Sequence, residues 1–269
     1  MPANSKLESL YKSFSATDRI LVAFSGGVDS TFLLYVLKMF SGAQVSAVTV
    51  KTPYIPQWEV DEAKQFCISM NISHEILEMP MPTSILMNPP DRCYKCKSVL
   101  FGKIKEYAAG KDFNIIADGS NADDKNDYRP GMAALRELDV RSPLLETGIS
   151  KEEIRKYLRD YGLDIWDKPA YACLLTRLPH DQRISSRDLQ LIEESELFLH
   201  GIGFKGARVR LHRNTARLEI DPGLFNKILE NKIREKIIKQ FKARGIEFVS
   251  LDLEGYRTGS MNPKNKRKQ

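Results

Sequence analysis

The stretch RILVAFSGGVDSTFLLYVL, residues 19–37, decides the fold class of this chain. A short run of aliphatic residues stops at Ser25, Gly26 and Gly27, and apolar residues at helical spacing follow. The stretch therefore predicts a buried strand, a glycine turn and a helix. The glycines let the backbone approach a phosphate, and the free N–H groups at the start of the helix favour an anion.

Strands and helices alternate through the first half of the chain. The apolar patterns predict further strands over 44–50, 74–79 and 114–118, and helices over 59–70, 97–109 and 151–161. Such a βαβα order is typical of a doubly wound parallel sheet, so we predict an α/β domain over residues 1–184. Ligands of these sheets bind beyond the carboxyl ends of the strands.

A second, smaller domain is predicted after residue 184. The patterns there predict helices over 186–199 and 225–244, and strands over 207–211, 215–220 and 247–253. We interpret residues 185–261 as an α+β domain for substrate binding or oligomerisation, and residues 262–269 as a disordered basic tail. The irregular segment 166–185 contains several reactive residue types, and long irregular segments in compact domains are usually functional or disordered.

The composition is that of an ordinary soluble globular protein, with 42% hydrophobic and 28% charged residues among 269. No apolar run approaches the roughly 20 residues that cross a bilayer, and the first residues lack the apolar core of a signal peptide. We therefore expect a cytoplasmic protein without a membrane partner. The net charge is +6, but four positive charges lie in the tail 262–269, so the rest of the chain carries only about +2. Nucleic acid is therefore an unlikely partner. RNA binding through the tail is the alternative.

The glycine turn SGGVDS, residues 25–30, is the first candidate site. Its hydroxyl groups can donate hydrogen bonds to phosphate oxygens. It is not a Walker A loop, because the terminal Gly-Lys-Ser/Thr is missing. An ordinary strand-to-helix turn with Ser30 as N-cap is the alternative. The phosphate-binding candidates are Ser25, Gly26, Gly27, Ser30 and Thr31.

Cysteine spacing provides the second candidate site. Cys93 and Cys96 stand three positions apart in NPPDRCYKCK, residues 88–97. Four cysteines in a cytosolic chain of this size do not indicate a disulfide framework, so the pair indicates metal or redox chemistry. Cys67 lies inside a predicted helix, where a buried free thiol is common.

Several long motifs resemble a known family. SGGVDS resembles the pyrophosphate-binding loop of the N-type ATP pyrophosphatases. The other motifs are similar to those of the LarE family, in the same order, from about residue 10 to residue 262. They are DRCYKC (91–96), DGSNADDKNDYRPG (118–131), KPAYACLLTR (168–177), ARVRLHRNTARLEI (207–220) and VSLDLEGYRTGSMN (249–262).

The resemblance implies an activity. A LarE-type enzyme splits ATP between its α- and β-phosphates, with Mg²⁺, and adenylates the carboxylates of pyridinium-3,5-biscarboxylic acid mononucleotide. It then converts them to thiocarboxylates in the synthesis of the nickel-pincer nucleotide cofactor of lactate racemase. The resemblance places Asp29 in the ATP loop and the adenine pocket near Val48 to Lys51. Asp118, with Asp123, Asp124 and Asp127, is a candidate for Mg²⁺ or ribose, and a solvated acidic loop is the alternative for the last three.

The family resemblance also bears on the sulfur source. One branch of the family sacrifices a cysteine of its own, and another binds a [4Fe-4S] cluster through three cysteines. Cys93, Cys96 and Cys173 resemble the second pattern. Three thiolates hold three irons and leave the fourth open, so that it can carry the sulfide. Zinc with Cys67 as a fourth ligand, a redox pair and a sacrificial Cys173 are the alternatives.

A phosphorylated substrate calls for arginines. Arg177 follows the Cys173 loop, and alternation places Arg208 and Arg210 on one face of a strand, at positions that bind phosphate in the family. Glu219 on the neighbouring strand is a further candidate for the substrate or a metal. Arg129, next to a proline, is interpreted as a structural anchor.

Two other functions compete with this interpretation. A cluster-dependent tRNA thiolase with the same loop is one, although no zinc-ribbon cysteines or RNA-binding domain are found. A nucleotide-sensing protein that kept the fold is the other, and it would bind ATP without releasing pyrophosphate. The sequence leaves open the sulfur donor and the oligomeric state, with a homo-oligomer as one possibility.

Overall fold

The computed structural model describes residues 5–126, 131–169 and 171–257. Within these ranges, no helix is both long enough and apolar enough to cross a membrane.

The chain divides into two compact units. The first unit consists of Met1–Ser84 and Asp91–Lys168, and the second of Ile85–Pro90 and Pro169–Gln269. The irregular segment after Lys168 thus groups with the C-terminal unit, whereas the predicted boundary after residue 184 places it in the first domain. The domain boundary after residue 184 stays a prediction.

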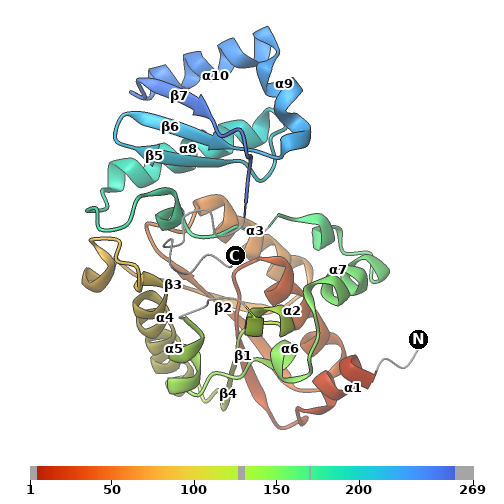
Figure 1. Cartoon of the computed structure of the whole chain (residues 1–269). Coiled ribbons are helices and arrows are strands. Elements are labelled where there is room, and N and C mark those ends of the chain that lie inside the picture. Colours follow the sequence, from red (N-terminus) through yellow and green to blue (C-terminus); the bar gives the residue numbers. More distant parts are fainter. Residues whose placement is uncertain (1–4, 127–130, 170, 258–269) are drawn as a thin grey trace. The chain divides into compact units, whose positions relative to one another are not determined.

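The first unit contains a four-stranded parallel sheet with the order β3-β2-β1-β4 (Figure 1). Its strands are β1 (Arg19–Ala23), β2 (Gln44–Lys51), β3 (Ser73–Glu78) and β4 (Ile115–Ala117). Its helices are α1 (Ser5–Lys12), α2 (Val28–Phe40), α3 (Gln57–Ser69), α4 (Arg92–Ala109), α5 (Gly131–Glu137), α6 (Pro143–Glu146) and α7 (Lys151–Asp160).

Helices cover both faces of this sheet, as a doubly wound fold requires. Ile20 and Val22 of β1 pack into one buried cluster with Phe32 of α2. Leu21, between them, points to the opposite face and packs with Phe101 of α4. This alternation follows from the two-residue period of a strand. The α/β fold class predicted from the sequence is confirmed.

The second unit contains a smaller mixed sheet with the order β5-β6-β7 (Figure 1). Strands β5 and β6 are antiparallel, and β6 and β7 are parallel. Its elements are α8 (Ser186–Gly201), β5 (Arg208–His212), β6 (Thr215–Glu219), α9 (Phe225–Leu229), α10 (Asn231–Ala243) and β7 (Phe248–Leu251). Val209 and Leu218 pack with Phe241 of α10 in its core. This small α+β unit is also confirmed.

Two helices differ from the sequence-based expectation. Helix α4 begins at Arg92 rather than at residue 97, so both cysteines of the CxxC pair lie in its first turns. The polar segment RCYKC has no apolar period, which explains the missed start. The predicted helix 225–244 is broken at Glu230, whose ψ of 132° is extended. Ile228 and Ile237, on either side of the break, enter the same core, so the apolar pattern runs through it.

Candidate functional site

The predicted phosphate loop, residues 25–30, joins β1 to α2. Gly26 has a φ of +68°, a conformation that residues with a Cβ rarely adopt. The Ser25 and Ser30 hydroxyl oxygens are 3.1 Å apart, and the Ser30 hydroxyl donates to the Gly27 carbonyl at 3.2 Å. The residues singled out in the sequence therefore form one compact, internally hydrogen-bonded loop.

The N-terminus of α2 adjoins this loop. Its N-cap is Gly27, and the Thr31 N–H makes the first helical bond to the Gly27 carbonyl at 3.0 Å. In the described part of the chain, no side chain caps this helix, so its first N–H groups can bind an anion. The Thr31 hydroxyl is buried and has no hydrogen-bond partner among the described residues. Ser30 lies inside the helix and is not its N-cap.

Asp29 forms an ion pair with Lys151, the first residue of α7. The Lys151 ammonium donates to the two Asp29 carboxylate oxygens at 2.7 and 2.6 Å. The backbone N–H of Lys151 donates to Asp123 Oδ2 at 2.8 Å. Asp123 and Asp124 both accept backbone N–H groups, Asp124 from Asn121 at 3.0 Å. These acidic side chains thus have structural partners, and a role in binding Mg²⁺ stays a prediction.

A second lysine contacts the glycine end of the loop. The Lys168 ammonium donates to the Gly26 carbonyl at 2.8 Å and pairs with Glu62 at 2.6 Å. Arg155 of α7 donates to the Lys168 carbonyl at 2.9 Å. Lys168 is therefore held through both its side chain and its backbone, directly before the segment that leads to Cys173.

Asp118 lies at the carboxyl end of β4 and is buried. Its carboxylate accepts hydrogen bonds from the Ser120 and Ser142 hydroxyls, both at 2.6 Å, and lies 3.8 Å from the Lys97 ammonium. Gly119 follows, and a Cβ there would lie 2.8 Å from the Ser30 nitrogen. Only a glycine lets this segment lie directly against the start of α2.

Lys51, predicted near the adenine pocket, is the last residue of β2. Its carbonyl accepts the Met79 N–H at 2.9 Å, and the Val48 carbonyl accepts the Phe24 N–H at 2.8 Å. The Lys51 ammonium pairs with Glu78 at 3.2 Å. The sheet therefore uses these two carbonyls, and adenine binding here stays a prediction.

The CxxC pair lies on α4, with Cys93 exposed and Cys96 partly buried. The fully buried Tyr54, in the segment after β2, places its hydroxyl 3.1 Å from Cys96 Sγ. Hydrogen bonds to a ligand sulfur tune and orient metal sites. Of the two thiols, Cys96 has this contact, and a metal centre on the pair stays a prediction. Cys173 belongs to the second unit, and within the described residues no group of three or more His, Cys, Asp or Glu side chains has the placement of a metal site.

Cys67 does not share these properties. It is fully buried in α3, as the sequence predicted, and burial raises the pKa of its thiol to about 12. The thiolate is the form that binds metals. Cys67 is therefore a core residue.

Cys173 is followed by the short helix Leu174–Arg177, and Arg177 holds its backbone. The Arg177 guanidinium donates to the carbonyls of Ala172, at 2.5 Å, and Cys173, at 3.0 Å. It also forms a two-pronged pair with Glu196 of α8, at 2.8 and 2.9 Å. Arg177 is 1% exposed. These contacts favour a positioning role for Arg177 over direct contact with a phosphate.

Glu196 links the Cys173 segment to β5. Besides the Arg177 guanidinium, its carboxylate accepts the Val209 N–H at 2.9 Å. Burial raises the pKa of Glu196, whereas the charge and hydrogen bonds of Arg177 lower it. The lowering is larger, so the pKa lies below the ordinary value of 4.5. A buried ionised glutamate therefore joins the Cys173 segment to the strand that carries Arg208 and Arg210.

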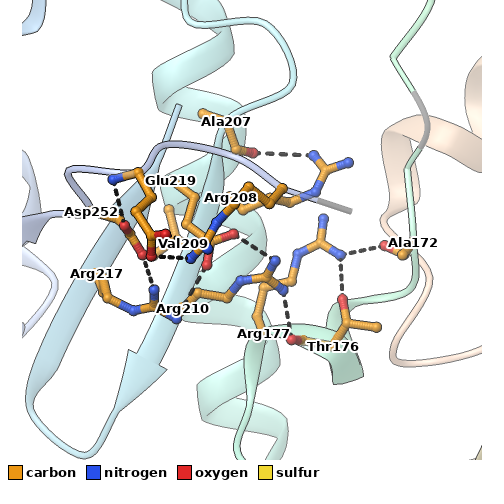
Figure 2. A network of polar contacts seen from close by, with 12 residues as sticks. Ala172, Thr176, Arg177, Ala207, Arg208, Val209, Arg210, Arg217, Glu219 and Asp252 are labelled. Atoms are coloured by element: carbon orange, nitrogen blue, oxygen red, sulfur yellow. Dashed lines mark hydrogen bonds and ion pairs between the residues drawn. The ribbon is translucent and has the colours of Figure 1, made fainter. Parts of the chain in front are cut away.

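Arg208 and Arg210 lie on one face of β5 and are both buried (Figure 2). The Arg208 guanidinium lies 4.8 Å from the ring centre of Tyr171 and 5.2 Å from that of Tyr256. It donates to the carbonyls of Gly206 and Ala207, both at 3.2 Å. Burial and the nearby Arg177 charge lower the pKa of Arg208. An arginine still keeps its proton there.

Arg210 and Arg217 share one carboxylate, that of Glu219 (Figure 2). The Glu219 oxygens lie 2.7 Å from Arg210 and 3.1 Å from Arg217, and Glu219 is 0% exposed. Arg210 also donates to the Thr176 carbonyl at 2.7 Å, and Arg217 pairs with Asp252. Glu219 is thus engaged by arginines, and its contact with a substrate or metal stays a prediction.

Sequence reasoning missed five residues that organise these sites. They are Tyr54, Gly119, Lys151, Lys168 and Glu196. Only Gly119 and Lys168 carried a signal, because both lie inside motifs that had been singled out. Asp127 and Arg129, which the acidic-loop motif includes, lie outside the described residues.

One protein family and several known proteins are similar to this chain. The PP-loop domain family matches residues 1–85. The chain is 38% identical over 261 residues to protein slr1717 of Synechocystis sp., which covers 96% of this chain and 97% of that protein. It is 30% identical over 260 residues to the pyridinium-3,5-bisthiocarboxylic acid mononucleotide synthase of Lactiplantibacillus plantarum, covering 96% and 94%. The tRNA-specific 2-thiouridylase MnmA 1 of Fusobacterium nucleatum matches at 30% over 182 residues, 59% of this chain and 49% of that enzyme.

The parallel sheet, the SGGVDS loop and the open helix N-terminus define a PP-loop ATP pyrophosphatase. The similarity to the Lactiplantibacillus synthase extends over almost the whole of both chains. The chain therefore belongs to the LarE family and is an ATP-dependent sulfurtransferase.

Proposed function

We propose that this enzyme inserts sulfur into the carboxylates of pyridinium-3,5-biscarboxylic acid mononucleotide, in the synthesis of the nickel-pincer nucleotide cofactor of lactate racemase. The observation that carries the proposal is the similarity over 96% of the chain to a synthase named for the bisthiocarboxylic product. The tRNA thiolase matches over only 59% of the chain and 49% of its own length.

The first step is adenylation of a substrate carboxylate. The carboxylate oxygen attacks the α-phosphorus of ATP, the bond to the bridging oxygen breaks, and pyrophosphate leaves. The α2 N-terminus and the Ser25 and Ser30 hydroxyls suit the leaving pyrophosphate, since both offer donors to an anion. Mg²⁺ bound with ATP would neutralise further charge on the phosphates. Asp29 and Asp118, at this end of the sheet, are the carboxylates that we assign to the ATP-binding site.

The second step transfers sulfur. A sulfide attacks the adenylated carboxyl carbon, and AMP leaves with the electron pair of the broken C–O bond. AMP is a good leaving group, whereas a free carboxylate does not accept sulfide. The step consumes one sulfide for each carboxylate converted, so the enzyme needs a sulfur donor.

The arginines of the second unit support binding of the substrate phosphate. In the described cluster, Arg177, Arg210 and Arg217 pair with three carboxylates, those of Glu196, Glu219 and Asp252. Arg208 adds a fourth guanidinium group on the same strand as Arg210. The cluster keeps a positive excess, and buried guanidinium groups bind phosphate strongly. Arg208 is the member with aromatic rings around it, and we assign it the leading role in phosphate binding.

For the sulfur source we propose a [4Fe-4S] cluster held by Cys93, Cys96 and Cys173. The donor chemistry fits, because three thiolates are the ligands of such a cluster, and Tyr54 supports the Cys96 sulfur. When bound, the cluster would leave one iron available to hold the sulfide. Sacrifice of the Cys173 sulfur is the alternative source, and the exposed or partly exposed state of all three thiols is compatible with both.

Anaerobic purification with iron and acid-labile sulfide analysis separates the two sources. The cluster predicts both elements, their loss in Cys93→Ala, Cys96→Ala and Cys173→Ala, and their retention in Cys67→Ala, the matched control. Mass analysis of the protein after turnover then reports the fate of Cys173. Conversion of Cys173 to dehydroalanine, with one turnover per chain, would contradict the catalytic cluster.

A further inference from the structure

The phosphate loop contains no positively charged side chain. Residues 25–31 read SGGVDST, and the loop itself adds the negative charge of Asp29. A P-loop places a lysine of its own against the phosphates, but this loop lacks that lysine. The positive charge that neutralises the triphosphate must therefore come from bound Mg²⁺ and from other parts of the chain.

Lys151 is the cation that the fold places at Asp29, while Lys168 contacts the Gly26 carbonyl at the other end of the loop. Its ammonium lies 2.6 Å from the nearer Asp29 oxygen, with exposed side-chain fractions of 30% for Lys151 and 25% for Asp29. Its backbone is fixed by Asp123, and Ser150 and Glu153 cap the helix that it opens through a reciprocal capping box. Helix α7 thus holds the ammonium group at the end of the loop where α2 starts.

We propose that Lys151 is the phosphate-binding cation of this loop and takes the β- and γ-phosphates that leave as pyrophosphate. An ammonium group has three N–H donors. Two of them are directed at the Asp29 oxygens, so within the described residues one donor is left for a phosphate oxygen. The inference deepens the proposed function, and it rests only on ATP binding, not on the sulfur-transfer step.

Folding stability alone gives a weak reason for this ion pair. Partly exposed pairs contribute little to stability because water screens them. A site that must receive a highly charged anion, by contrast, gains from a lysine kept close by a carboxylate. Asp29 neutralises Lys151 while the loop is empty. Once ATP binds, Asp29 and the phosphates can share the Lys151 ammonium group or a Mg²⁺ ion.

The test is calorimetric titration of pyrophosphate, ATP and AMP, each with Mg²⁺ and without the sulfur-accepting substrate. Lys151→Met is expected to weaken pyrophosphate and ATP binding by about tenfold to a hundredfold, as loss of a hydrogen bond between charged groups does. AMP lacks the two phosphates, so its affinity should stay within about twofold. Lys156→Met, which removes an exposed lysine from the same helix, is the matched control and should change none of the three.

A second pair of proteins separates direct contact from simple neutralisation of Asp29. If Lys151 binds phosphate, Lys151→Met also weakens pyrophosphate binding in an Asp29→Asn background, and Lys151→Arg restores most of the affinity. Equal affinities of Asp29→Asn and the Asp29→Asn/Lys151→Met double variant would overturn the inference. Equal weakening of all three ligands, AMP included, would also overturn it, because it would indicate a distorted loop. Absence of sulfur transfer with intact pyrophosphate binding would contradict the proposed function alone.

Discussion

Replacing Glu196 with alanine removes the carboxylate that joins the Cys173 segment to β5. Three hydrogen bonds disappear, two from Arg177 and one from the Val209 N–H. Arg177 is 1% exposed and would keep a buried charge without this carboxylate. Breaking a buried pair in this way costs about 3–5 kcal/mol of unfolding free energy. For a chain of this length that corresponds to a fall in Tm of roughly 6–20 °C.

Thermal unfolding followed by circular dichroism measures this loss. Glu194→Ala is the matched control, since Glu194 lies on the same helix, is 45% exposed and pairs with Arg244 at 3.4 Å. It should cost less than about 1 kcal/mol. Removing both charges, in an Arg177→Met/Glu196→Leu variant, should cost less than Glu196→Ala alone, because no unpaired charge is left. Equal Tm values for the Glu196→Ala and Glu194→Ala proteins would refute the reasoning.

The same pair predicts a dependence of stability on pH. Arg177 lowers the net pKa of Glu196 in the folded protein below the ordinary value of 4.5. The stabilisation is then complete above the unfolded pKa and is lost as the pH falls through the folded pKa. The wild type should therefore lose stability below about pH 4.5, and Glu196→Ala should lose less over the same range. Parallel acid titrations of the two proteins would contradict this assignment.

Three further changes test other parts of the structure. Gly119→Ala should weaken ATP binding at least about tenfold and lower the free energy of unfolding by about 1–3 kcal/mol, because its Cβ meets the start of α2 at 2.8 Å. Gly102→Ala, with nothing within 4 Å, is the control and should be neutral or slightly stabilising. Equal ATP affinities of the two variants would contradict the close approach. Tyr54→Phe should lower the affinity for the proposed metal centre about tenfold in a chelator challenge, since hydrogen bonds to metal ligands have effects of that size. Unchanged iron retention would remove Tyr54 from the site. Cys67 should resist a thiol reagent in the folded, cluster-free protein, given its pKa of about 12, while rapid labelling would contradict its burial.

Local patterns predicted most of the fold. The stretch 19–37 combines a buried strand, a positive-φ glycine and an apolar helix, and each signal acts over a few residues. The alternation of Arg208 and Arg210 on one face was predictable for the same reason. Their burial was not, because it depends on β6, which pairs with β5, and on the short helix Leu174–Arg177, whose Thr176 carbonyl accepts from Arg210.

The partners of the site residues were harder to predict than the residues themselves. Lys151 is 122 positions from Asp29, and Glu196 lies on a helix whose acidic residues look like a solvated face. No periodicity connects such residues, because their contact arises only when the strands and helices pack. The start of α4 was missed for a different reason, since its first turns are polar and carry thiols in place of core side chains.

The most direct test of the central claim is a single incubation of the anaerobically prepared enzyme with ATP, Mg²⁺, a sulfide source and pyridinium-3,5-biscarboxylic acid mononucleotide. Pyrophosphate and the thiocarboxylate product are measured together, by enzymatic assay and mass spectrometry. We predict pyrophosphate release that depends on the mononucleotide, with one pyrophosphate and one AMP for each oxygen replaced by sulfur. Pyrophosphate release at the same rate without the mononucleotide, or a product without sulfur, would contradict the account.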